Sequence, residues 1–301
     1  MTSRRALITG AGGFIGSALR RELARAGWLV FSAVRRTSRR KLGQSAPGIE
    51  LLHDGTTADM ARLVRRARPD VVFHLASLFL AEHRAEDVES LCRSNILFGT
   101  QVLEAVSSME VSGFINTGTA WQHYRGADYS PVNLYAATKQ AFENILDYYV
   151  QARGMRAVTL KIFDSYGPGD RRPKIWKALR DSGPKRAPLI LSGGKQKLDP
   201  VYIDDITAAY LAAARRLLTG KARGHEIYAL SSGRPRSLRQ IVQLYSRVMK
   251  KKIPASWGAR PYRKREVMIP WSKGKRLPGW RPKIGLEEGI LLANGLKRGK
   301  A

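Results

Sequence analysis

The chain of 301 residues is long enough for one large α/β domain or two smaller ones. Its hydrophobic fraction of 44% supports a substantial buried core and excludes wholesale disorder. The single cysteine, Cys92, excludes an intramolecular disulfide and a cysteine-based zinc site, and its apolar helical context predicts a buried, inert thiol. No run approaches the roughly 20 consecutive apolar residues of a membrane span, and no secretory signal is recognisable before Gly10. We therefore expect a soluble cytoplasmic protein.

The charge is extreme, because 53 Lys and Arg face 24 Asp and Glu, which gives a net charge of +29. The basic residues are scattered along the chain, and no nucleic-acid-binding module is recognisable. We therefore expect a solvated basic surface and no nucleic-acid partner. Binding to nucleic acid, an anionic membrane or another polymer stays open as the alternative.

The first half of the chain alternates short apolar runs with helical segments. Strands are expected at residues 6–9, 28–34, 71–76, 111–117 and 157–163, and helices at 17–25, 63–67, 91–108 and 134–153. Alternation on this scale is typical of βαβ units, so it predicts an α/β fold with a doubly wound parallel sheet.

The pattern changes after about residue 166, where Pro, Gly, Lys and Arg accumulate. A helix is expected over 203–218, a strand over 226–230 and a helix over 237–249 that is capped by Ser237. We predict a cofactor-binding domain over 1–165, to which 199–230 returns. A smaller, irregular α/β lobe over 166–301 would bind the substrate.

A glycine-rich segment, TGAGGFIG at residues 9–16, follows the first expected strand and opens the first expected helix. Glycines there permit a tight turn and a close backbone approach to a pyrophosphate, which the helix N-terminus attracts. The alternative is a turn that only connects the two elements. The segment predicts dinucleotide binding by Gly10, Gly12, Gly13, Phe14, Ile15 and Gly16.

The end of the second expected strand carries Arg35 and Arg36, followed by Thr37 and Ser38, and no acidic residue. NAD-binding units use an Asp or Glu there for the ribose hydroxyls, whereas arginines suit the 2′-phosphate of NADP. We therefore predict NADP(H), the alternative being an ordinary basic loop. Asp54 and Gly55 lie where a third strand would end near the adenine.

Tyr135 and Lys139 lie four residues apart at the start of a long expected helix, and so share one face. The lysine could lower the pKa of the tyrosine from about 10 towards neutrality, which suits proton transfer. Thr117 and Thr119 end a strand at the same edge of the sheet, where Thr119 could polarise a carbonyl. The alternative for such a Tyr–Lys pair is an ordinary surface turn of helix.

Together these motifs resemble the extended short-chain dehydrogenases/reductases, the NAD-dependent epimerase/dehydratase family with a Rossmann-type fold. Five further segments carry the resemblance: HLAS at 74–77, SNI at 94–96, LKIFDSYGP at 160–168, DPVYIDD at 199–205 and RKRE at 263–266. The resemblance implies cofactor contacts from Leu75, Ala76, Ser77, Asn95, Thr117, Tyr135, Lys139 and Phe163. It also implies a homodimer that pairs the helices near 91–108 and 134–153.

Departures from the family pattern help to choose an activity. The acidic pair that dehydratases carry after the catalytic threonine is replaced by Ala120 and Trp121, and the usual asparagine of the sixth strand is Asp164. The segments 118–124 and 133–143 resemble bacterial CDP-abequose and CDP-paratose synthases, which reduce a CDP-linked 4-keto-3,6-dideoxy sugar. The expected activity is therefore NADPH-dependent reduction of a nucleotide-linked 4-keto sugar, CDP-linked in the favoured case.

In this interpretation Tyr135 is the proton donor, Lys139 supports it, and Thr119 binds the carbonyl oxygen. The expected substrate contacts are Thr119, Trp121, His123, Asp164, Tyr202, Arg263 and Arg265, with Arg263 or Arg265 on the pyrophosphate. His123 could equally be structural, and no metal site is expected. The alternatives are a nucleotide-sugar 4-epimerase that retains its cofactor, and a non-catalytic NADP sensor or nucleic-acid-binding scaffold.

Overall fold

The computed structural model describes residues 3–36, 47–109 and 111–296. Its centre is a seven-stranded sheet in the order β11-β6-β5-β4-β1-β2-β3, with every neighbouring pair parallel. The strands are β1 (Arg5–Thr9), β2 (Leu29–Arg35), β3 (Ile49–His53), β4 (Val71–His74), β5 (Gly113–Thr119), β6 (Ala157–Ile162) and β11 (His225–Leu230). The strand order reverses between β1 and β4, so the predicted doubly wound, Rossmann-type sheet is confirmed.

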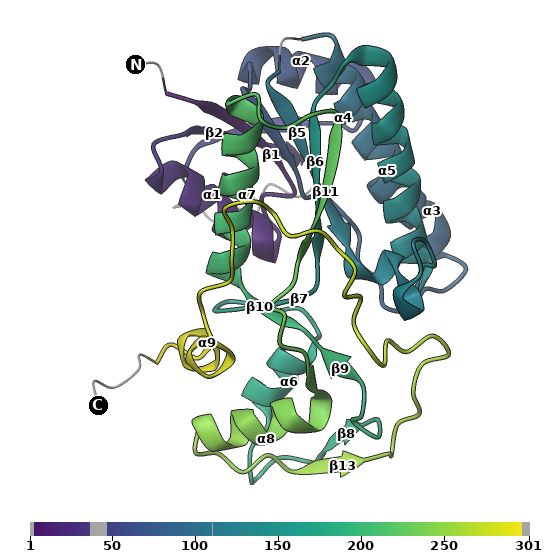
Figure 1. Cartoon of the computed structure of the whole chain (residues 1–301), viewed down its shortest axis with the longest axis vertical. Coiled ribbons are helices and arrows are strands. Elements are labelled where there is room, and N and C mark those ends of the chain that lie inside the picture. The colour runs from purple at the N-terminus through teal and green to yellow at the C-terminus, as the bar shows by residue number, and fades with distance from the viewer. Residues whose placement is uncertain (1–2, 37–46, 110, 297–301) are drawn as a thin grey trace.

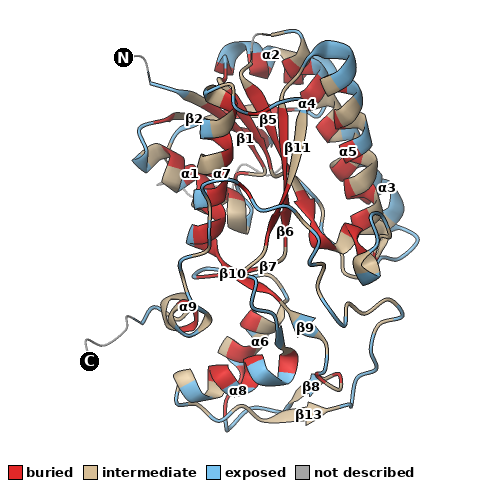
Figure 2. Ribbon diagram, viewed as in Figure 1, coloured by how far each residue is buried: buried red, intermediate tan, exposed pale blue. Residues whose placement is uncertain are grey.

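Helices cover both faces of this sheet (Figure 1). The first face carries α1 (Phe14–Arg25) and α7 (Ile203–Leu218), which contact each other. The second face carries α2 (Thr57–Ala67), α4 (Phe98–Ser107) and α5 (Leu134–Arg153). Because both faces are covered, the central strands are buried along their length, as Figure 2 shows in red. That is why these strands read as continuous apolar runs in the sequence.

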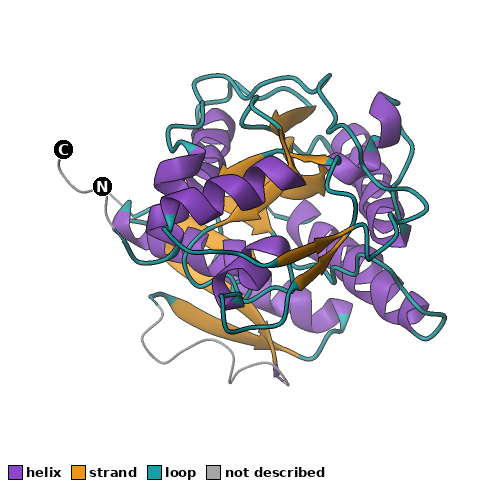
Figure 3. Cartoon of the chain, turned by 90° about the horizontal axis from the view of Figure 1, so that it is seen from below, coloured by secondary structure: helices purple, strands orange, loops and turns teal. Residues whose placement is uncertain are grey.

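The remaining elements form a lobe below the carboxyl ends of the strands, seen end-on in Figure 3. The lobe has its own core, centred on Tyr166, Trp176 and Tyr245. Its helices are α6 (Ile175–Asp181), α8 (Leu238–Val248) and α9 (Leu286–Ala293). Its strand pairs are β7 (Asp164–Tyr166) with β10 (Pro200–Tyr202), β8 (Leu189–Leu191) with β13 (Ala255–Trp257), and β9 (Lys197–Leu198) with β12 (Arg236–Ser237).

The C-terminal segment, residues 258–285, returns from the lobe to the sheet (Figure 1). On the way its backbone bonds first to the lobe, where Lys197 N–H donates to Met268 at 2.9 Å. It then bonds to the sheet, where Ala229 N–H donates to Lys275 at 2.8 Å. Trp280 finally donates to the carbonyl of Asp205 in α7. This segment therefore crosses the space between lobe and sheet.

A helix is present over most of residues 91–108, as expected, with one local difference. It begins earlier, as α3 (Asp87–Cys92), and continues through a π-helical turn, η2 (Arg93–Leu97), into α4. The expectation that Cys92 is buried was wrong. Cys92 is exposed rather than buried, because one residue of helix, about 100° of rotation, separates it from the fully buried Leu91. Within the described ranges, no helix combines the length and the apolar character that a membrane crossing needs.

Candidate active site

The glycine-rich loop joins β1 to α1 at the carboxyl edge of the sheet. Gly10 has φ +72°, and a Cβ on it would collide with the backbone of Leu75 and Ala76, the loop after β4. A Cβ on Gly16 would collide with the carbonyl of Gly10. No side chain caps α1 at Gly13, so the first-turn N–H groups of this helix remain available to an anion. The loop therefore fits the pyrophosphate of a dinucleotide.

Asn95 holds the loop that follows β4. Its amide oxygen accepts from Ser77 Oγ at 3.0 Å and from Leu78 N–H at 2.7 Å. Its amide nitrogen donates to the Leu78 carbonyl and to Thr138 Oγ1 on α5. The π-helical turn directs this buried side chain towards the loop, a distortion often found at functional sites. Asn95 thus fixes the position of Ser77, one of the residues expected to contact the cofactor.

The end of β2 places Arg35 and Arg36 at the surface beside the end of β3. Arg35 pairs in register with His53, and the charge of Arg36 helps to lower the pKa of Asp54. The larger cause is that the Asp54 carboxylate accepts from the N–H and hydroxyl of Thr56. Thr37 and Ser38, also expected near a ribose phosphate, lie outside the described residues.

Tyr135 and Lys139 lie on adjacent turns at the start of α5. Burial raises the pKa of Tyr135 to about 12, although a hydrogen bond with Ser77 and the charge of Arg172 oppose the shift. Burial lowers the pKa of Lys139 to about 8, and the carboxylate of Glu143 opposes that shift. Lys139 is not among the groups that lower the pKa of Tyr135 here, contrary to expectation. The tyrosine is therefore a neutral proton donor at neutral pH.

Thr119 ends β5 and caps the short 3₁₀ turn Ala120–Gln122. Its hydroxyl oxygen accepts from Trp121 N–H at 3.3 Å, while its own N–H donates to the side-chain oxygen of Gln122 at 3.0 Å. Because the hydroxyl oxygen already accepts a bond, its proton can be donated to a substrate oxygen. Thr117, two residues earlier, is instead bonded to the His74 carbonyl and to Tyr210.

A buried polar chain runs from α5 to the loop after β5. Glu143 pairs with Lys161 of β6 at 3.1 Å, and the Lys161 ammonium donates to His123 Nε2 at 2.9 Å. The other nitrogen of His123, Nδ1, lies 3.1 Å from the carbonyl of Ala127. Burial and Lys161 lower the pKa of His123, so the ring is neutral. Both of its nitrogens are occupied, which makes His123 a fixed surface and not an acid or base.

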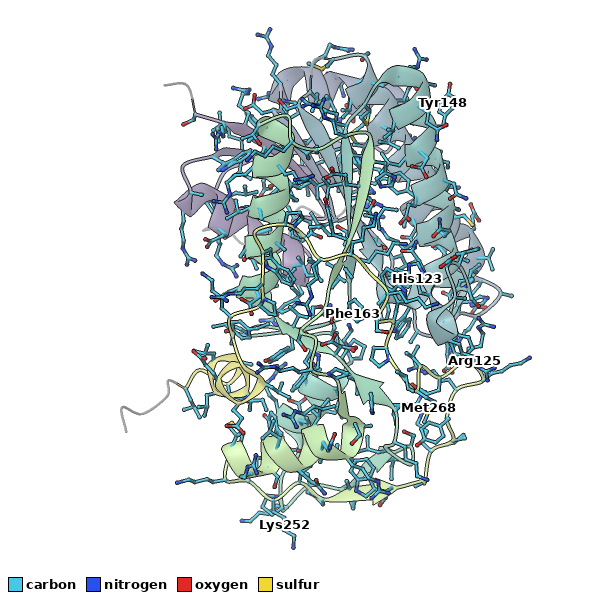
Figure 4. The ribbon with its side chains drawn as sticks, viewed as in Figure 1. His123, Arg125, Tyr148, Phe163, Lys252 and Met268 are labelled. Atoms are coloured by element: carbon cyan, nitrogen blue, oxygen red, sulfur yellow. The ribbon has the colours of Figure 1, made fainter. Side chains whose placement is uncertain are left out.

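His123 stacks on Trp271 of the C-terminal segment, with ring centroids 3.8 Å apart. Phe163, which follows β6, is parallel to Trp271 within 8°. Figure 4 shows His123 and Phe163 in the space between sheet and lobe. The three rings form an aromatic wall that connects the expected nicotinamide contact, Phe163, with the expected sugar contact, His123. Trp271 was not among the predicted site residues.

These rings face a cavity of about 630 Å³ between the sheet and the lobe, a size typical of ligand sites. Trp121, His123, Phe163, Asp164 and Arg263 line it, as their predicted roles require. Tyr135, Lys139 and Thr119 are not lining residues. The ring of Phe79, which does line the cavity, packs edge-on against Tyr135 at 5.0 Å.

Besides Thr119, two further predicted substrate residues lie away from the cavity lining. Arg265 donates to Ser130 Oγ at 2.6 Å and stacks on Tyr124. Tyr202 is buried in the lobe core against Tyr166. Their contacts with substrate stay predictions.

Comparison with known proteins agrees with this geometry. CDP-abequose synthase of Yersinia pseudotuberculosis is 28% identical over 88% of this chain and 91% of that protein. UDP-glucuronate 4-epimerase of Thermodesulfobacterium geofontis is 31% identical over 54% of this chain and 49% of that protein. The crystal structure of Thermus thermophilus UDP-glucose 4-epimerase in complex with NAD superposes with a TM-score of 0.79 and 25% identity, covering 99% of this chain and 100% of that one.

The family described as the NAD dependent epimerase/dehydratase family matches residues 6–229, which span the glycine loop, Thr119, Tyr135 and Lys139. The motifs, the sheet order and the site geometry agree with this match. The chain belongs to the NAD dependent epimerase/dehydratase family, whose members include enzymes that act on nucleotide-sugars.

Proposed function

We propose that the protein catalyses the NADPH-dependent reduction of the 4-keto group of a nucleotide-linked deoxy sugar, with CDP as the favoured nucleotide. The observation that carries the proposal is the set of Tyr135 and Lys139 on adjacent turns of α5 and Thr119 at the end of β5, because reduction of a ketone needs a proton donor and a hydrogen bond to the developing alkoxide. The match to CDP-abequose synthase over most of both chains supports the substrate class.

The bound dinucleotide supplies the hydride to the carbonyl carbon. Thr119 donates a hydrogen bond to the carbonyl oxygen as negative charge develops there. Its hydrogen bonds with the Gln122 side chain and with Trp121 N–H fix its position before the substrate binds. Tyr135 transfers its proton to that oxygen. The ammonium of Lys139, one helical turn away, would hold the ribose next to the nicotinamide when the dinucleotide is bound. The aromatic wall of His123, Trp271 and Phe163 offers an apolar face to a sugar ring.

The pKa of Lys139 predicts how the rate of reduction depends on pH. Its pKa of about 8 means that the ammonium form is present below this pH and is lost above it. We therefore expect kcat for reduction to fall as the pH rises through about 8, while Tyr135, with its higher pKa, stays protonated.

The choice of NADP over NAD rests on Arg35 and Arg36, which are exposed where β2 ends. Guanidinium groups at this position suit a 2′-phosphate, and no acidic residue follows β2 within residues 35–41. The Thermus thermophilus relative was crystallised with NAD, so the distinction belongs to this chain's own residues.

A 4-epimerase that retains its cofactor is the second candidate, favoured by the relatives that are named epimerases. The same Thr119, Tyr135 and Lys139 would serve it, but it would have to remove a proton first. The match to CDP-abequose synthase over most of both chains supports the reductase instead. A non-catalytic sensor or nucleic-acid scaffold would need none of these three residues.

The decisive experiment is incubation of the purified protein with a CDP-linked 4-keto-3,6-dideoxy sugar and either NADPH or NADH. We expect stoichiometric oxidation of NADPH, and turnover about 10²- to 10⁴-fold lower in Tyr135→Phe. Tyr148→Phe, an exposed tyrosine on the same helix, is the matched control and should retain full turnover. Replacing Arg35 and Arg36 by Ala should weaken NADPH more than NADH.

Two results would contradict the proposal. Conversion of the sugar without net cofactor oxidation would indicate an epimerase, and normal turnover by Tyr135→Phe would remove the assigned proton donor. A cytoplasmic location and a homodimer remain part of the proposal. The exposed Leu97 and Tyr148, beside α4 and on α5, support a subunit contact there.

A further inference from the structure

Two segments of the lobe, residues 182–198 and 231–265, contain no acidic residue. Together they carry 15 of the 53 Lys and Arg of the chain and none of its 24 Asp and Glu. Outside these segments, acidic residues offset a large part of the positive charge. The excess is therefore distributed unevenly, and it is complete only in this part of the lobe.

The fold brings the two segments together into one layer. β8 pairs with β13, and β9 pairs with β12, so each strand of the first segment lies beside a strand of the second. The first turn of α8 bonds to the same layer, where Leu238 N–H donates to the Gln196 carbonyl at 2.9 Å. The loops before β8 and β13 also meet, because Leu189 N–H donates to the Pro254 carbonyl at 2.9 Å. Charges that are separated in the sequence therefore lie close together.

We call the exposed side chains of residues 182–198 and 231–265 the basic face. Twelve of its 15 Lys and Arg are exposed. Figure 1 shows α8 and β13 at the end of the lobe that is farthest from the sheet, and Figure 4 shows Lys252 at the tip of this end. Arg239 and Arg247, eight residues apart on α8, lie on one exposed side of the helix, about 12 Å from each other.

Few carboxylates neutralise the basic face. Within the described ranges, Arg247 and Arg263 are its only members that form an ion pair, with Glu287 and Glu266. In the pair of Arg247 both side chains are more than half exposed, so the attraction between them is weak. The basic face therefore presents an unbalanced positive charge to the solvent.

The side chains among these charges fit a lipid surface better than a nucleic acid. Phosphates of either partner attract Lys and Arg, but single-stranded nucleic acids also stack their bases on aromatic rings. Of the three aromatic side chains in the two segments, Tyr245 is buried, and the guanidinium of Arg239 covers Trp257 at 4.5 Å. Only Tyr262 is left exposed. Ile190, on β8 at the rim of the cavity, is 58% exposed, and an aliphatic side chain suits lipid rather than bases.

We propose that the basic face of the lobe binds the surface of an anionic lipid bilayer. Each Lys or Arg close to such a surface strengthens binding about fivefold, so several of them together give a stable peripheral attachment. The sheet lies at the other end of the molecule and stands away from the lipid (Figure 1). The attachment does not depend on the reaction that takes place in the cavity.

The test is flotation of the full chain with vesicles of phosphatidylcholine, either alone or with about 30% phosphatidylglycerol. We expect binding to the vesicles that contain phosphatidylglycerol and none to phosphatidylcholine alone. Because the attraction is electrostatic, raising sodium chloride from about 50 to about 300 mM should release the protein. Equal binding to both kinds of vesicle, or to neither, would overturn the proposal.

A fourfold variant locates the attachment on the protein. Four exposed residues of the two adjoining loops are replaced by glutamine, and the loss of four charges should weaken vesicle binding about 100-fold. The residues are Lys185, Arg186, Lys250 and Lys252. The melting temperature should stay close to that of the wild type, because none of the four forms an ion pair with a described residue.

The matched control removes the same charge from the other end of the molecule. It replaces exposed residues at or just after the ends of α2, α5 and α7 by glutamine, and it should weaken vesicle binding less than about threefold. These residues are Arg65, Arg66, Arg153 and Lys221. An equal loss in the two variants would show that only the net charge matters, and would overturn the proposal. So would displacement of the protein from anionic vesicles by an equal phosphate concentration of a single-stranded oligonucleotide, which would identify a nucleic acid as the preferred partner.

Discussion

The buried pair of Glu143 and Lys161 links α5, which carries Tyr135 and Lys139, to the aromatic wall of His123, Trp271 and Phe163. Both side chains are about 2% exposed, and their charged atoms lie 3.1 Å apart. Glu143 lies one turn beyond Lys139 and raises the pKa of that lysine, while Lys161 holds His123 against Trp271. One carboxylate thus serves two purposes, because it keeps Lys139 protonated and anchors the lysine that fixes the aromatic wall.

The substitution Glu143→Gln tests both roles of the carboxylate, because each role has its own measurement. Loss of the carboxylate should lower the pKa of Lys139 below 8, so the alkaline fall of kcat should move to lower pH. The substitution leaves Lys161 buried without its partner, which should lower the free energy of unfolding by about 3 kcal/mol. pH–rate profiles and urea unfolding measure both quantities. Glu89→Gln, from the exposed pair with Arg93, is the control. If kcat of Glu143→Gln falls at the same alkaline pH as kcat of the wild type, Glu143 has only a structural role.

Tyr135 and Lys139 could be singled out from the sequence because they lie in a local pattern, a spacing of four residues. Trp271 could not, because its place in the aromatic wall depends on His123, which lies far away in the chain. Trp271 has no local signal that distinguishes it from other aromatic residues of the C-terminal half.

At the scale of elements, the N-terminus of α5 positions Tyr135, the proposed proton donor. Asn133 caps the helix by accepting from Ala136 N–H at 3.0 Å. Its amide nitrogen also donates to the carbonyls of Leu80 and Ala81, in the loop that carries Phe79. The cap therefore ties the first turn of α5, which contains Tyr135, to the loop that covers it.

Asn133→Ala should reduce both stability and turnover. Loss of the cap should cost about 1–2 kcal/mol of unfolding free energy, and release of the 80–81 loop should lower kcat. Ser237→Ala removes the cap of α8 in the lobe, so it should cost a similar free energy and leave kcat unchanged. Urea unfolding and steady-state kinetics test the pair. Equal kcat values in the two variants would show that the Asn133 cap is structural only.

The expected elements agree best with the structure where periodicity extends over many residues. The helices expected at 134–153 and 203–218 have those bounds, and the Ser237 cap is confirmed. The strands of two or three residues, such as β7 and β10, were not predicted, because so short a segment shows no period. The helix α9 did carry a signal, since Glu287 and Glu288 occupy its first turn.

At the scale of the whole molecule, the positions of the arginines explain part of the net charge of +29. Arginines occupy the last turn of six helices, where a positive charge complements the helix dipole. They are Arg25, Arg65, Arg66, Arg153, Arg180, Arg215, Arg216 and Arg247. Acidic residues do not balance them at the opposite ends of α1, α5, α6 and α8. Each of these arginines is therefore favourable at its own helix end, and together they add to the net positive charge of the chain.

Because of this excess of positive charge, we expect added salt to stabilise the folded protein and to weaken its binding of anionic ligands. Sodium chloride screens the repulsion between like charges, so raising it to moderate concentrations should increase the melting temperature by about 2–4 °C. The same screening should weaken the binding of CDP. Thermal unfolding and calorimetry along one salt series test both signs. A melting temperature that falls with salt would show that attractive ion pairs outweigh the net repulsion.

The path of the C-terminal segment has a consequence for biosynthesis. The sheet is complete once β11 has been made, at Leu230, whereas the wall carried by Arg263 and Trp271 is translated later. Domains fold in the order in which they emerge from the ribosome. We therefore expect the proposed dinucleotide site to form before the proposed substrate wall. A dinucleotide that binds at this stage would stabilise the folded sheet.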